Sequence, residues 1–380
     1  MTDSWRGYGH KKLGVALIGS GFMGSVHTRA YKSLPLAFPN TVYPDVRVVA
    51  DATDELAHAA ARRWEIPSWT SDWRSLLDDD SIDIVDICAP PNLHREIGLA
   101  AAAAGKHVYC EKPLGVNTAE TSDLCEAVHQ HNVASFVGFN YRWAPATIFA
   151  RQLIAAGKIG TVRNFRAAFN SDWAAADDIP WAWRFDHKTA GYGALGDVGS
   201  HVFDMARFRV GEIAHVAGYT RQVIFERPLA GASSSGTTTR EVDNDDEWGA
   251  LVRFEGGATG LLEGSRVATG SKTRFTFEVV GSVGSLRWDF ERMNELEVYA
   301  PRQDSALDGF TRVLMGNSHP YQGAFVPQAG ISIGFLETKV LEIMAFLEGI
   351  STGVAAAPTF DDGLAVARLL DQVAENNAAQ

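Results

Sequence analysis

The first 140 residues alternate between two hydrophobic patterns. Short, almost unbroken apolar runs are typical of strands buried on both faces, and the stretches between them repeat apolar residues with helical spacing. This alternation predicts a parallel sheet with helices on both faces, a doubly wound α/β domain. The expected strands are residues 13–18, 46–50, 82–89, 107–111 and 134–139, and the expected helices are residues 25–34, 53–64, 92–104 and 118–131.

The pattern changes after about residue 145, where strands follow one another without helical crossovers. That spacing predicts an α+β domain with a large, mostly antiparallel sheet. Residues 229–246 are rich in Ser, Thr and Gly and are expected to form a mobile loop. The expected strands are residues 162–169, 215–222, 247–254, 259–265, 273–280, 284–290 and 295–300, with helices at 144–156, 196–210, 337–348 and 361–376.

The length of the chain agrees with a division into two domains. A single core stops growing at roughly 250–300 residues, and this chain has 380. We place the boundary after residue 142, which gives a doubly wound domain at 1–142 and an α+β domain at 143–380. The last helix, 361–376, is a candidate to pack back near the first domain.

Composition and charge exclude some classes of partner. Lys and Arg number 34 against 46 Asp and Glu, and a net charge of −12 argues against nucleic acids and anionic membranes as ligands. The N-terminal sequence shows no signal peptide, and no apolar run approaches the roughly 20 residues of a spanning helix. Three cysteines without CxxC spacing favour reduced thiols rather than a zinc site. We therefore expect a cytoplasmic protein.

A glycine-rich segment joins the first expected strand to the first expected helix. Its pattern, G-x-G-x-x-G, cradles a pyrophosphate when it lies inside a strand–helix–strand unit. The first glycine permits a tight turn, the second lets the backbone approach the phosphates, and the third allows close packing of helix on sheet. This context predicts a Rossmann-type dinucleotide-binding domain. The expected phosphate-binding residues are Gly19, Gly21, Phe22, Met23 and Gly24.

The second expected strand ends at an acid. Asp51 directly follows residues 46–50, where a carboxylate can accept hydrogen bonds from the adenosine ribose hydroxyls. Asp45 is nearer to the usual spacing from the glycines, but it precedes the strand instead of ending it. A carboxylate here repels a 2′-phosphate, and Ala52 and Thr53 offer no cation to bind one. The expected cofactor is therefore NAD rather than NADP.

Lys112 is the first candidate for proton transfer. A hydride can leave an alcohol carbon only if a base or a metal takes the hydroxyl proton. The scattered cysteines argue against a catalytic zinc, so we expect no metal, and the only Tyr-x-x-x-Lys sequence precedes the glycine segment. Lys112 follows the fourth strand in the sequence Glu-Lys-Pro-Leu, at the carboxyl edge where ligands bind in such folds. A solvated lysine at the end of a strand is the alternative.

The expected helix 196–210 carries the second candidate. Asp197 and His201 are four residues apart, so their side chains share one face of a helix. A carboxylate placed there can hold a substrate hydroxyl and raise the basicity of the imidazole, whose ordinary pKa of about 6.5 suits proton transfer. Asp204, three residues further on, could orient the ring. An ordinary acid–histidine pair on a helix surface is the alternative.

These features occur together and in one order along the chain. With residues 89–94 (Ala-Pro-Pro-Asn-Leu-His) and 105–108 (Gly-Lys-His-Val), they resemble the Gfo/Idh/MocA oxidoreductase family over essentially the whole length. The resemblance implies that Lys112, Asp197 and His201 form a catalytic triad. It also implies a Rossmann domain followed by a largely antiparallel sheet domain, and a homo-oligomer, either a dimer or a tetramer. The residues that it implies at the cofactor are Pro90, Asn92, His94, Glu111, Lys112 and Asn140.

Other stretches resemble the branch of this family that oxidises the 3-hydroxyl of an anhydrosugar. Among them are residues 139–142 (Phe-Asn-Tyr-Arg), 183–185 (Trp-Arg-Phe) and 319–321 (His-Pro-Tyr). Aromatic faces beside polar donors suit the rings and hydroxyls of sugars, although each tryptophan could equally fill the core. We therefore expect an NAD-dependent dehydrogenase of an anhydrosugar or a pyranose. The expected substrate-binding residues are Lys112, Arg142, Trp183, Arg184, Asp197, His201 and His319.

Several alternatives stay open. The same residues could serve an inositol dehydrogenase or a ketosugar reductase, and some relatives retain NAD and cleave a glycosidic bond without net oxidation. A non-catalytic NAD-binding regulator is a further alternative. The complete set of Lys112, Asp197 and His201 argues against it, because a sensor has no need of groups that transfer protons.

Overall fold

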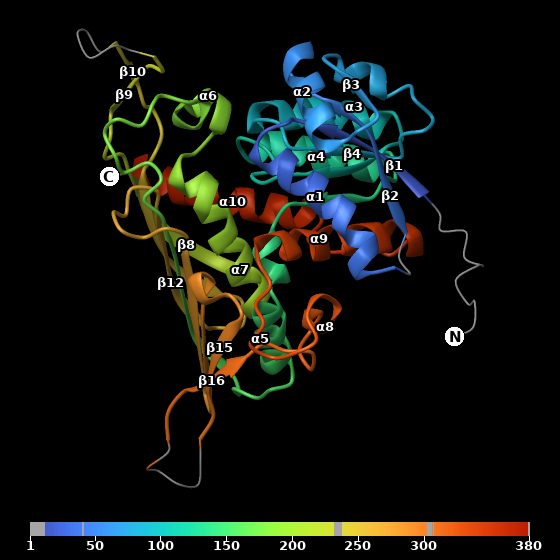
Figure 1. Cartoon of the computed structure of the whole chain (residues 1–380). Helices are drawn as coiled ribbons and strands as arrows, with labels where there is room; N and C mark the ends of the chain where they lie inside the picture. The colour runs from blue at the N-terminus through green and yellow to red at the C-terminus, as the bar shows by residue number, and fades with distance from the viewer. Residues whose placement is uncertain (1–11, 40–41, 232–237, 302–305, 307, 379–380) are drawn as a thin grey trace, which may run out of the picture.

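The first domain is built on a six-stranded parallel sheet (Figure 1). The computed structural model describes residues 12–39, 42–231, 238–301, 306 and 308–378. The strand order β3-β2-β1-β4-β5-β6 changes direction between β1 and β4, and ligands of such sheets bind outside the carboxyl ends of the strands at this point. The strands are β1 (Lys12–Ile18), β2 (Tyr43–Ala50), β3 (Ser68–Thr70), β4 (Ile84–Ile87), β5 (His107–Cys110) and β6 (Ser135–Val137).

The four helices expected in this domain are present. Side chains that accept backbone N–H groups begin two of them: Thr53 accepts from Leu56, and Asn117 from Glu120. The third expected helix starts at Asn92, but this residue does not cap it. Asn92 lies in a 3₁₀ turn (η2, Pro91–Leu93), and the helix begins after that turn. The helices are α1 (Phe22–Ala37), α2 (Asp54–Trp64), α3 (His94–Ala103) and α4 (Thr118–Gln130).

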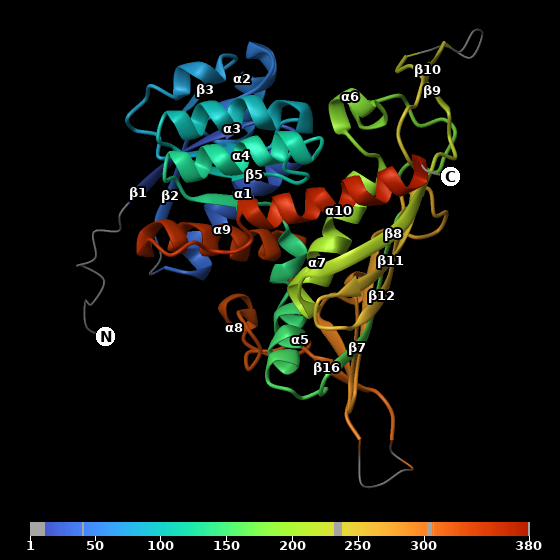
Figure 2. The same cartoon turned by 180° about the vertical axis from the view of Figure 1, so that it is seen from behind.

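The second domain contains an eight-stranded sheet, so the predicted fold class is confirmed. Its order is β16-β15-β14-β13-β7-β12-β11-β8, and the neighbours are antiparallel except for the parallel pair β7–β12. Figures 1 and 2 show the labelled helices on one side of this sheet. The strands are β7 (Val162–Asn170), β8 (Ile213–Arg221), β11 (Glu247–Phe254), β12 (Thr259–Ser265), β13 (Arg274–Gly281), β14 (Ser285–Asp289), β15 (Glu295–Tyr299) and β16 (Thr311–Leu314).

The stretch 229–246, expected to be a mobile loop, is largely ordered where the structure describes it. Residues 232–237 lie outside the described residues. On either side, β9 (Glu226–Pro228) and β10 (Thr239–Glu241) form a small antiparallel hairpin. Asn244, Asp245 and Asp246 are buried, with 6%, 8% and 0% of their surface exposed. The polar composition therefore reflects buried hydrogen bonding as well as a surface loop.

The helices of the second domain lie between its sheet and the first domain. A π-helical turn (η5, Leu195–Gly199) leads directly into α7 (Ser200–Val210). A π turn inside a helix is rare and frequently occurs at a functional site. Among the described residues, we find no helix whose length and apolarity would let it cross a membrane. The other helices are α5 (Pro145–Ala155), α6 (His187–Ala190), α8 (Gln322–Phe325), α9 (Phe335–Thr352) and α10 (Phe360–Ala378), with 3₁₀ turns η1 (Trp73–Leu76), η3 (Asn140–Trp143), η4 (Trp183–Phe185) and η6 (Phe290–Arg292).

Helix α9 packs on the first domain, although a boundary after residue 142 assigns it to the second. Its buried side chains, among them Val340 and Phe346, join one cluster with Tyr31 of α1 and Tyr109 of β5. An apolar helix face shows that the helix is covered but does not show which sheet covers it. The division at residue 142 therefore needs this correction.

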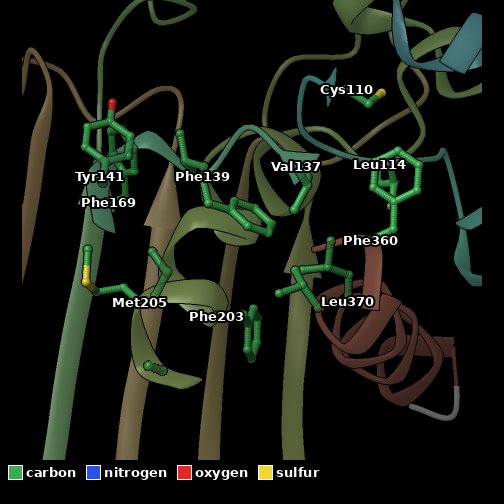
Figure 3. Close-up of a cluster of buried hydrophobic side chains, with 14 of the residues drawn as sticks. Cys110, Leu114, Val137, Phe139, Tyr141, Phe169, Phe203, Met205, Phe360 and Leu370 are labelled. Atoms are coloured by element: carbon green, nitrogen blue, oxygen red, sulfur yellow. The ribbon is translucent and has the colours of Figure 1, made fainter. Parts of the chain in front are cut away.

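A second apolar cluster crosses between the domains (Figure 3). Val137 and Phe139 from the first domain meet Phe203 of α7 and Leu370 of α10 within it. Helix α10 contacts α4 and β6 on one side and β8 and α7 on the other, and Figure 2 shows it running between the two sheets. Helix α10 therefore contacts both domains, and one continuous core joins them.

Candidate active site

The glycine segment forms an open cradle at the carboxyl end of β1. Gly19 adopts a φ of 105°, and a Cβ on it would lie 2.7 Å from the carbonyl carbon of Cys88. A Cβ on Gly24 would lie 2.1 Å from the carbonyl oxygen of Gly19, so this glycine allows α1 to approach the turn. At Gly21 a Cβ would meet no atom within 4 Å. The backbone is therefore bare at the position where a pyrophosphate must approach it.

Asp51 lies beside this cradle, as its place at the end of β2 predicts. Its carboxylate accepts a hydrogen bond from the Ser20 N–H at 2.6 Å and another from the Ser20 hydroxyl. Phe22 is 70% exposed at the start of α1, next to the cradle. A bare glycine turn, a helix N-terminus and an adjacent carboxylate fit a dinucleotide without a 2′-phosphate.

Substitution of Gly21 by valine is expected to weaken cofactor binding without unfolding the protein. The φ of −70° at Gly21 suits an L-residue, and the new side chain enters open space. The dissociation constant for NADH should rise at least about tenfold, which corresponds to about 1.4 kcal/mol. Fluorescence titration measures this change. Gly256→Val is the control, because a Cβ there also meets no atom within 4 Å but the residue lies in the turn between β11 and β12, so NADH affinity should not change. Unchanged NADH affinity in Gly21→Val would contradict the assignment of the cradle.

The other residues expected at the cofactor lie in the segments that follow β4, β5 and β6. His94 is buried, with Nδ1 3.0 Å from the Pro113 carbonyl oxygen and Nε2 2.8 Å from that of Ala89. It therefore connects the segments that follow β4 and β5. Asn140 is also buried and donates to the Thr338 hydroxyl at 3.2 Å. Asn92 is exposed, and Pro90 is half-buried.

Lys112 and Asp197 meet across the two domains. The Lys112 ammonium donates to Asp197 Oδ1 and to the Asp197 carbonyl oxygen, both at 2.8 Å. The two side chains are 16% and 37% exposed, so the pair is partly open to solvent. Burial raises the pKa of Asp197, but the charge and hydrogen bond of Lys112 outweigh it and bring the pKa to about 2. Asp197 is therefore ionised at neutral pH. The Lys112–Pro113 peptide bond is cis.

His201 follows in the first turn of α7 and is 6% exposed. Its ring packs edge-on against Tyr141, with 4.6 Å between the ring centroids, a neighbour that the sequence patterns did not indicate. Nδ1 is buried without a hydrogen-bond partner among the described residues. Burial, and then the charge of Lys112, lower the pKa of His201 well below its ordinary value. The imidazole is therefore neutral at physiological pH and able to accept a proton.

Two expectations about this region are wrong. Asp204 does not orient His201, because its carboxylate accepts from Arg142 Nε at 2.8 and 2.9 Å and from Nη2 at 2.5 Å. Arg142 is only 4% exposed and also donates to Asp362 of α10 at 3.2 Å. This buried ion pairing joins η3, α7 and α10. Arg142 thus supports the structure and is not available to bind a sugar hydroxyl.

The other substrate candidates fall into two groups. The Arg184 guanidinium lies 4.3 Å from the centre of the Trp183 ring, and its charge is one of the causes that lower the pKa of Asp197. Asn244 donates to the carbonyl oxygens of Arg184 at 3.0 Å and of Gly191 at 3.4 Å, so the Arg184 backbone lies beside the segment that leads to Asp197. His319 packs against Phe149 of α5, and its Nδ1 accepts from the Gly316 N–H at 3.0 Å. These contacts connect His319 to α5 and give no support for a place at the substrate.

Glu111, the residue before Lys112, belongs to a buried charge network. Its Oε1 is 2.9 Å from His27 Nε2 and 2.7 Å from the ammonium of Lys339, which α9 contributes. Lys339 also pairs with Glu342 at 2.6 Å, and His27 Nδ1 lies 2.8 Å from Asp86. Glu111 therefore anchors the backbone next to Lys112 from below. The sequence patterns did not indicate this network, because its partners are far apart along the chain.

Thermal stability is expected to fall as the pH rises through the range in which this network titrates. Burial raises the pKa of Glu342 from 4.5 to about 7, so between these values the folded state holds a proton that the unfolded state has released. Stability therefore decreases with pH in that window, by on the order of 2 kcal/mol or about 4–8 °C. Melting temperatures at pH 5 to 8 measure this slope. Glu342→Gln should flatten the slope below pH 6.5, whereas His27, whose pKa is raised to about 9, keeps a slope above it. An equally steep slope below pH 6.5 in that variant would contradict the assignment.

Known proteins share both halves of this arrangement. Residues 13–139 match the family described as "Oxidoreductase family, NAD-binding Rossmann fold", and residues 148–287 match the GFO/IDH/MocA C-terminal domain. The fold and the site thus define an NAD-binding oxidoreductase. The chain belongs to the Gfo/Idh/MocA family, as its motifs predict, which confirms the expected enzyme class and cofactor.

The similarity to particular relatives extends over nearly the whole chain. Levoglucosan dehydrogenase of Pseudarthrobacter phenanthrenivorans is 41% identical over 97% of each chain. A solved levoglucosan dehydrogenase in complex with NADH and levoglucosan gives a TM-score of 0.93 over 97% of this chain and 98% of that one, at 41% identity. Inositol 2-dehydrogenase of Rhizobium meliloti is 28% identical over 93% of this chain and 94% of its own.

Proposed function

We propose that this protein is an NAD-dependent dehydrogenase that oxidises a secondary hydroxyl of a cyclic sugar to a ketone. The substrate we infer is a levoglucosan-like anhydrosugar or a pyranose, oxidised at C3. One observation carries the proposal. The ammonium of Lys112, at the carboxyl edge of a nucleotide-binding sheet, lies 2.8 Å from Asp197. Asp197 belongs to the same helical stretch as His201, whose imidazole is buried and neutral.

The roles of the three residues follow from their environments. His201 takes the hydroxyl proton, because burial and Lys112 keep its imidazole neutral. Lys112 donates a hydrogen bond to the same oxygen and stabilises the negative charge that develops there. Asp197 holds the Lys112 ammonium in place and binds a substrate hydroxyl with its exposed oxygen. NAD, held by the glycine cradle and Asp51, supplies the acceptor for the hydride.

Two observations support a sugar rather than another alcohol. The chain is 41% identical to a levoglucosan dehydrogenase over almost its full length. In addition, Trp183 and Arg184 provide an aromatic face beside a cation, next to the segment that leads to Asp197, and this suits the apolar ring face and hydroxyl edge of a pyranose. We take this pair as the substrate-binding residues outside the triad.

Cofactor reduction with a panel of sugars tests the proposal. The purified protein, with NAD or NADP, is mixed with levoglucosan, other anhydrosugars, pyranoses and inositols, and absorbance is followed at about 340 nm, where reduced nicotinamide absorbs. We expect NADH formation with NAD and an anhydrosugar or pyranose. Reduction only by inositols would favour the inositol dehydrogenase that the Rhizobium relative suggests. Cleavage of a glycoside without net formation of NADH would indicate a redox-neutral glycosidase. Oxidation of NADH with ketosugars only would indicate a reductase. Binding of NAD without any turnover would indicate a regulator.

We also propose that the protein forms a homo-oligomer through the helix-free face of its eight-stranded sheet. Tyr219, Leu251 and Leu261 on neighbouring strands β8, β11 and β12 are 49%, 64% and 44% exposed. Contiguous apolar side chains on a surface are typical of an interface. Light scattering measures the mass, and a monomer would contradict this proposal.

A further inference from the structure

One buried residue holds the backbone that leads into the catalytic helix. We name residues 193–197 the catalytic turn. The N–H groups of Gly193 and Leu195 donate to the two carboxylate oxygens of Asp245, each at 2.7 Å. The intervening N–H, that of Ala194, donates to the carbonyl oxygen of the same Asp245 at 2.8 Å. Three consecutive amides therefore converge on a single residue, which lies just before β11.

We propose that Asp245 is a positioning residue for catalysis: it sets the catalytic turn so that Asp197 meets Lys112 and His201 faces the substrate. This inference rests on the proposed function, since it takes those three residues as the proton-transfer groups. Asp245 acts through the backbone and touches neither substrate nor cofactor.

The contact leaves the turn little freedom. Asp245 is 8% exposed, and a Cβ on Gly193 would lie 1.9 Å from the Asp245 carbonyl oxygen. The amides it accepts stand at the beginning of a helical stretch, where N–H groups lack partners within the helix and favour a negative charge. Asp197 is only two residues beyond Leu195. Because a misplacement of about 1 Å at reacting groups can reduce turnover about a hundredfold, a shift of the turn should be visible in kcat.

Asp246, the next residue, provides an internal comparison. It is fully buried, pairs with Arg266 Nε at 2.8 Å, and accepts the N–H groups of Val223 and Ile224, both at 2.8 Å. Its side chain thus resembles that of Asp245 in burial and in the number of backbone amides it accepts. None of the hydrogen bonds of its side chain goes to the catalytic turn. Loss of its charge should affect stability without moving Asp197.

The ionisation of His201 reports on the position of the turn independently of turnover. The charged groups that act on its imidazole are Lys112, Glu111, Asp197 and Lys339, and burial is the largest influence on its pKa. If the turn loosens, the ring gains solvent and moves relative to Lys112. Both changes raise the pKa of His201 toward its ordinary value. The acidic limb of kcat/KM should then move to higher pH.

The experiment compares four variants of the full chain with the native protein. Asp245→Asn and Asp245→Ser are the test variants, and each keeps some of the hydrogen-bond acceptors of the side chain. Asp246→Asn is the control matched in burial. Glu241→Gln is the control that changes an exposed acid of the same segment. The measurements are melting temperature, NADH affinity, kcat with the best sugar, and an NMR titration of His201 in the NADH complex, assigned with His201→Gln. For the Asp245 variants we expect kcat to fall about a hundredfold, NADH affinity to stay within about twofold, and His201 to titrate at higher pH. Asp246→Asn should lower the melting temperature without moving the His201 titration, and Glu241→Gln should change neither.

The outcomes separate this inference from the proposed function. A native protein that oxidises none of the sugars contradicts the function, yet the His201 titration still tests Asp245 because it needs no substrate. The inference is overturned if a folded Asp245 variant keeps the native titration and a kcat within about twofold of the native value. It is also overturned if Asp246→Asn shifts His201 equally, or if neither Asp245 variant folds, since Asp245 would then be structural only.

Discussion

Replacement of Lys112 by methionine is expected to lower kcat about a thousandfold while the dissociation constant for NADH changes by less than about threefold. Methionine keeps the length and the apolar stem of the side chain, so the change removes only the ammonium. That ammonium holds Asp197 at 2.8 Å and keeps the pKa of His201 low. Its loss removes a donor to the reacting oxygen and frees Asp197 at the same time.

His201→Ala should reduce kcat to a similar degree, because no other described group beside the pair has a neutral, basic nitrogen. In the native enzyme the low pKa of His201 means that kcat/KM rises with pH only below about 6.5 and is level above it. Steady-state kinetics with the best sugar and fluorescence titration with NADH measure both effects. Lys158→Met and His215→Ala, at exposed positions, are the matched controls. Near-normal turnover in both Lys112→Met and His201→Ala would reject these catalytic roles.

Lys339→Met is expected to destabilise the protein by about 3–5 kcal/mol, because it leaves carboxylates buried without their cation. Lys339 is fully buried and its ammonium lies 2.7 Å from Glu111 and 2.6 Å from Glu342. Burial lowers the pKa of Lys339, but the two carboxylates outweigh it and raise the pKa above its ordinary value. Thermal and denaturant unfolding measure the loss. The ion pair between Lys339 and Glu111 also connects α9 to the backbone next to Lys112. We therefore expect kcat to fall together with stability.

The control is Lys272→Met, whose ammonium pairs with Asp172 at 2.6 Å but is 76% exposed. An exposed pair contributes only about 0–1 kcal/mol, so this variant should stay close to the native protein. The double variant Lys339→Met/Glu342→Leu should recover part of the loss, since apolar packing replaces a broken ion pair. Equal stability of the Lys339→Met and Lys272→Met variants would contradict the importance of the network.

Local patterns were sufficient to predict the sheet of the first domain and the glycine cradle. Buried parallel strands are continuous apolar runs, and the glycines are required by backbone geometry that the structure confirms at Gly19 and Gly24. The strand β3 was missed because its three residues are too short to show a period. The motifs also located Lys112, Asp197 and His201, and the structure brings the first two into contact.

The rest depends on contacts between residues distant in the chain. Whether a buried acid such as Asp204 faces His201 or Arg142 depends on how η3 packs against α7, which no local pattern encodes. Likewise, the Ser- and Thr-rich neighbours of Asp245 indicate a loop, whereas its carboxylate satisfies buried amides from another segment. The π turn at residues 195–199 follows from packing around several glycines and has no hydrophobic signature of its own.

The position of α9 has a consequence for how the chain reaches its native state during synthesis. Helix α9, residues 335–352, covers one apolar side of the nucleotide-binding sheet. The strands of that sheet are synthesised early, whereas α9 leaves the ribosome after nearly nine-tenths of the polypeptide. Until then, Leu13, Tyr31 and Phe136 lack the α9 side chains that pack with them in the folded protein. The nucleotide-binding half is therefore completed late, and a fragment cut after residue 142 would lack one wall of its own interior.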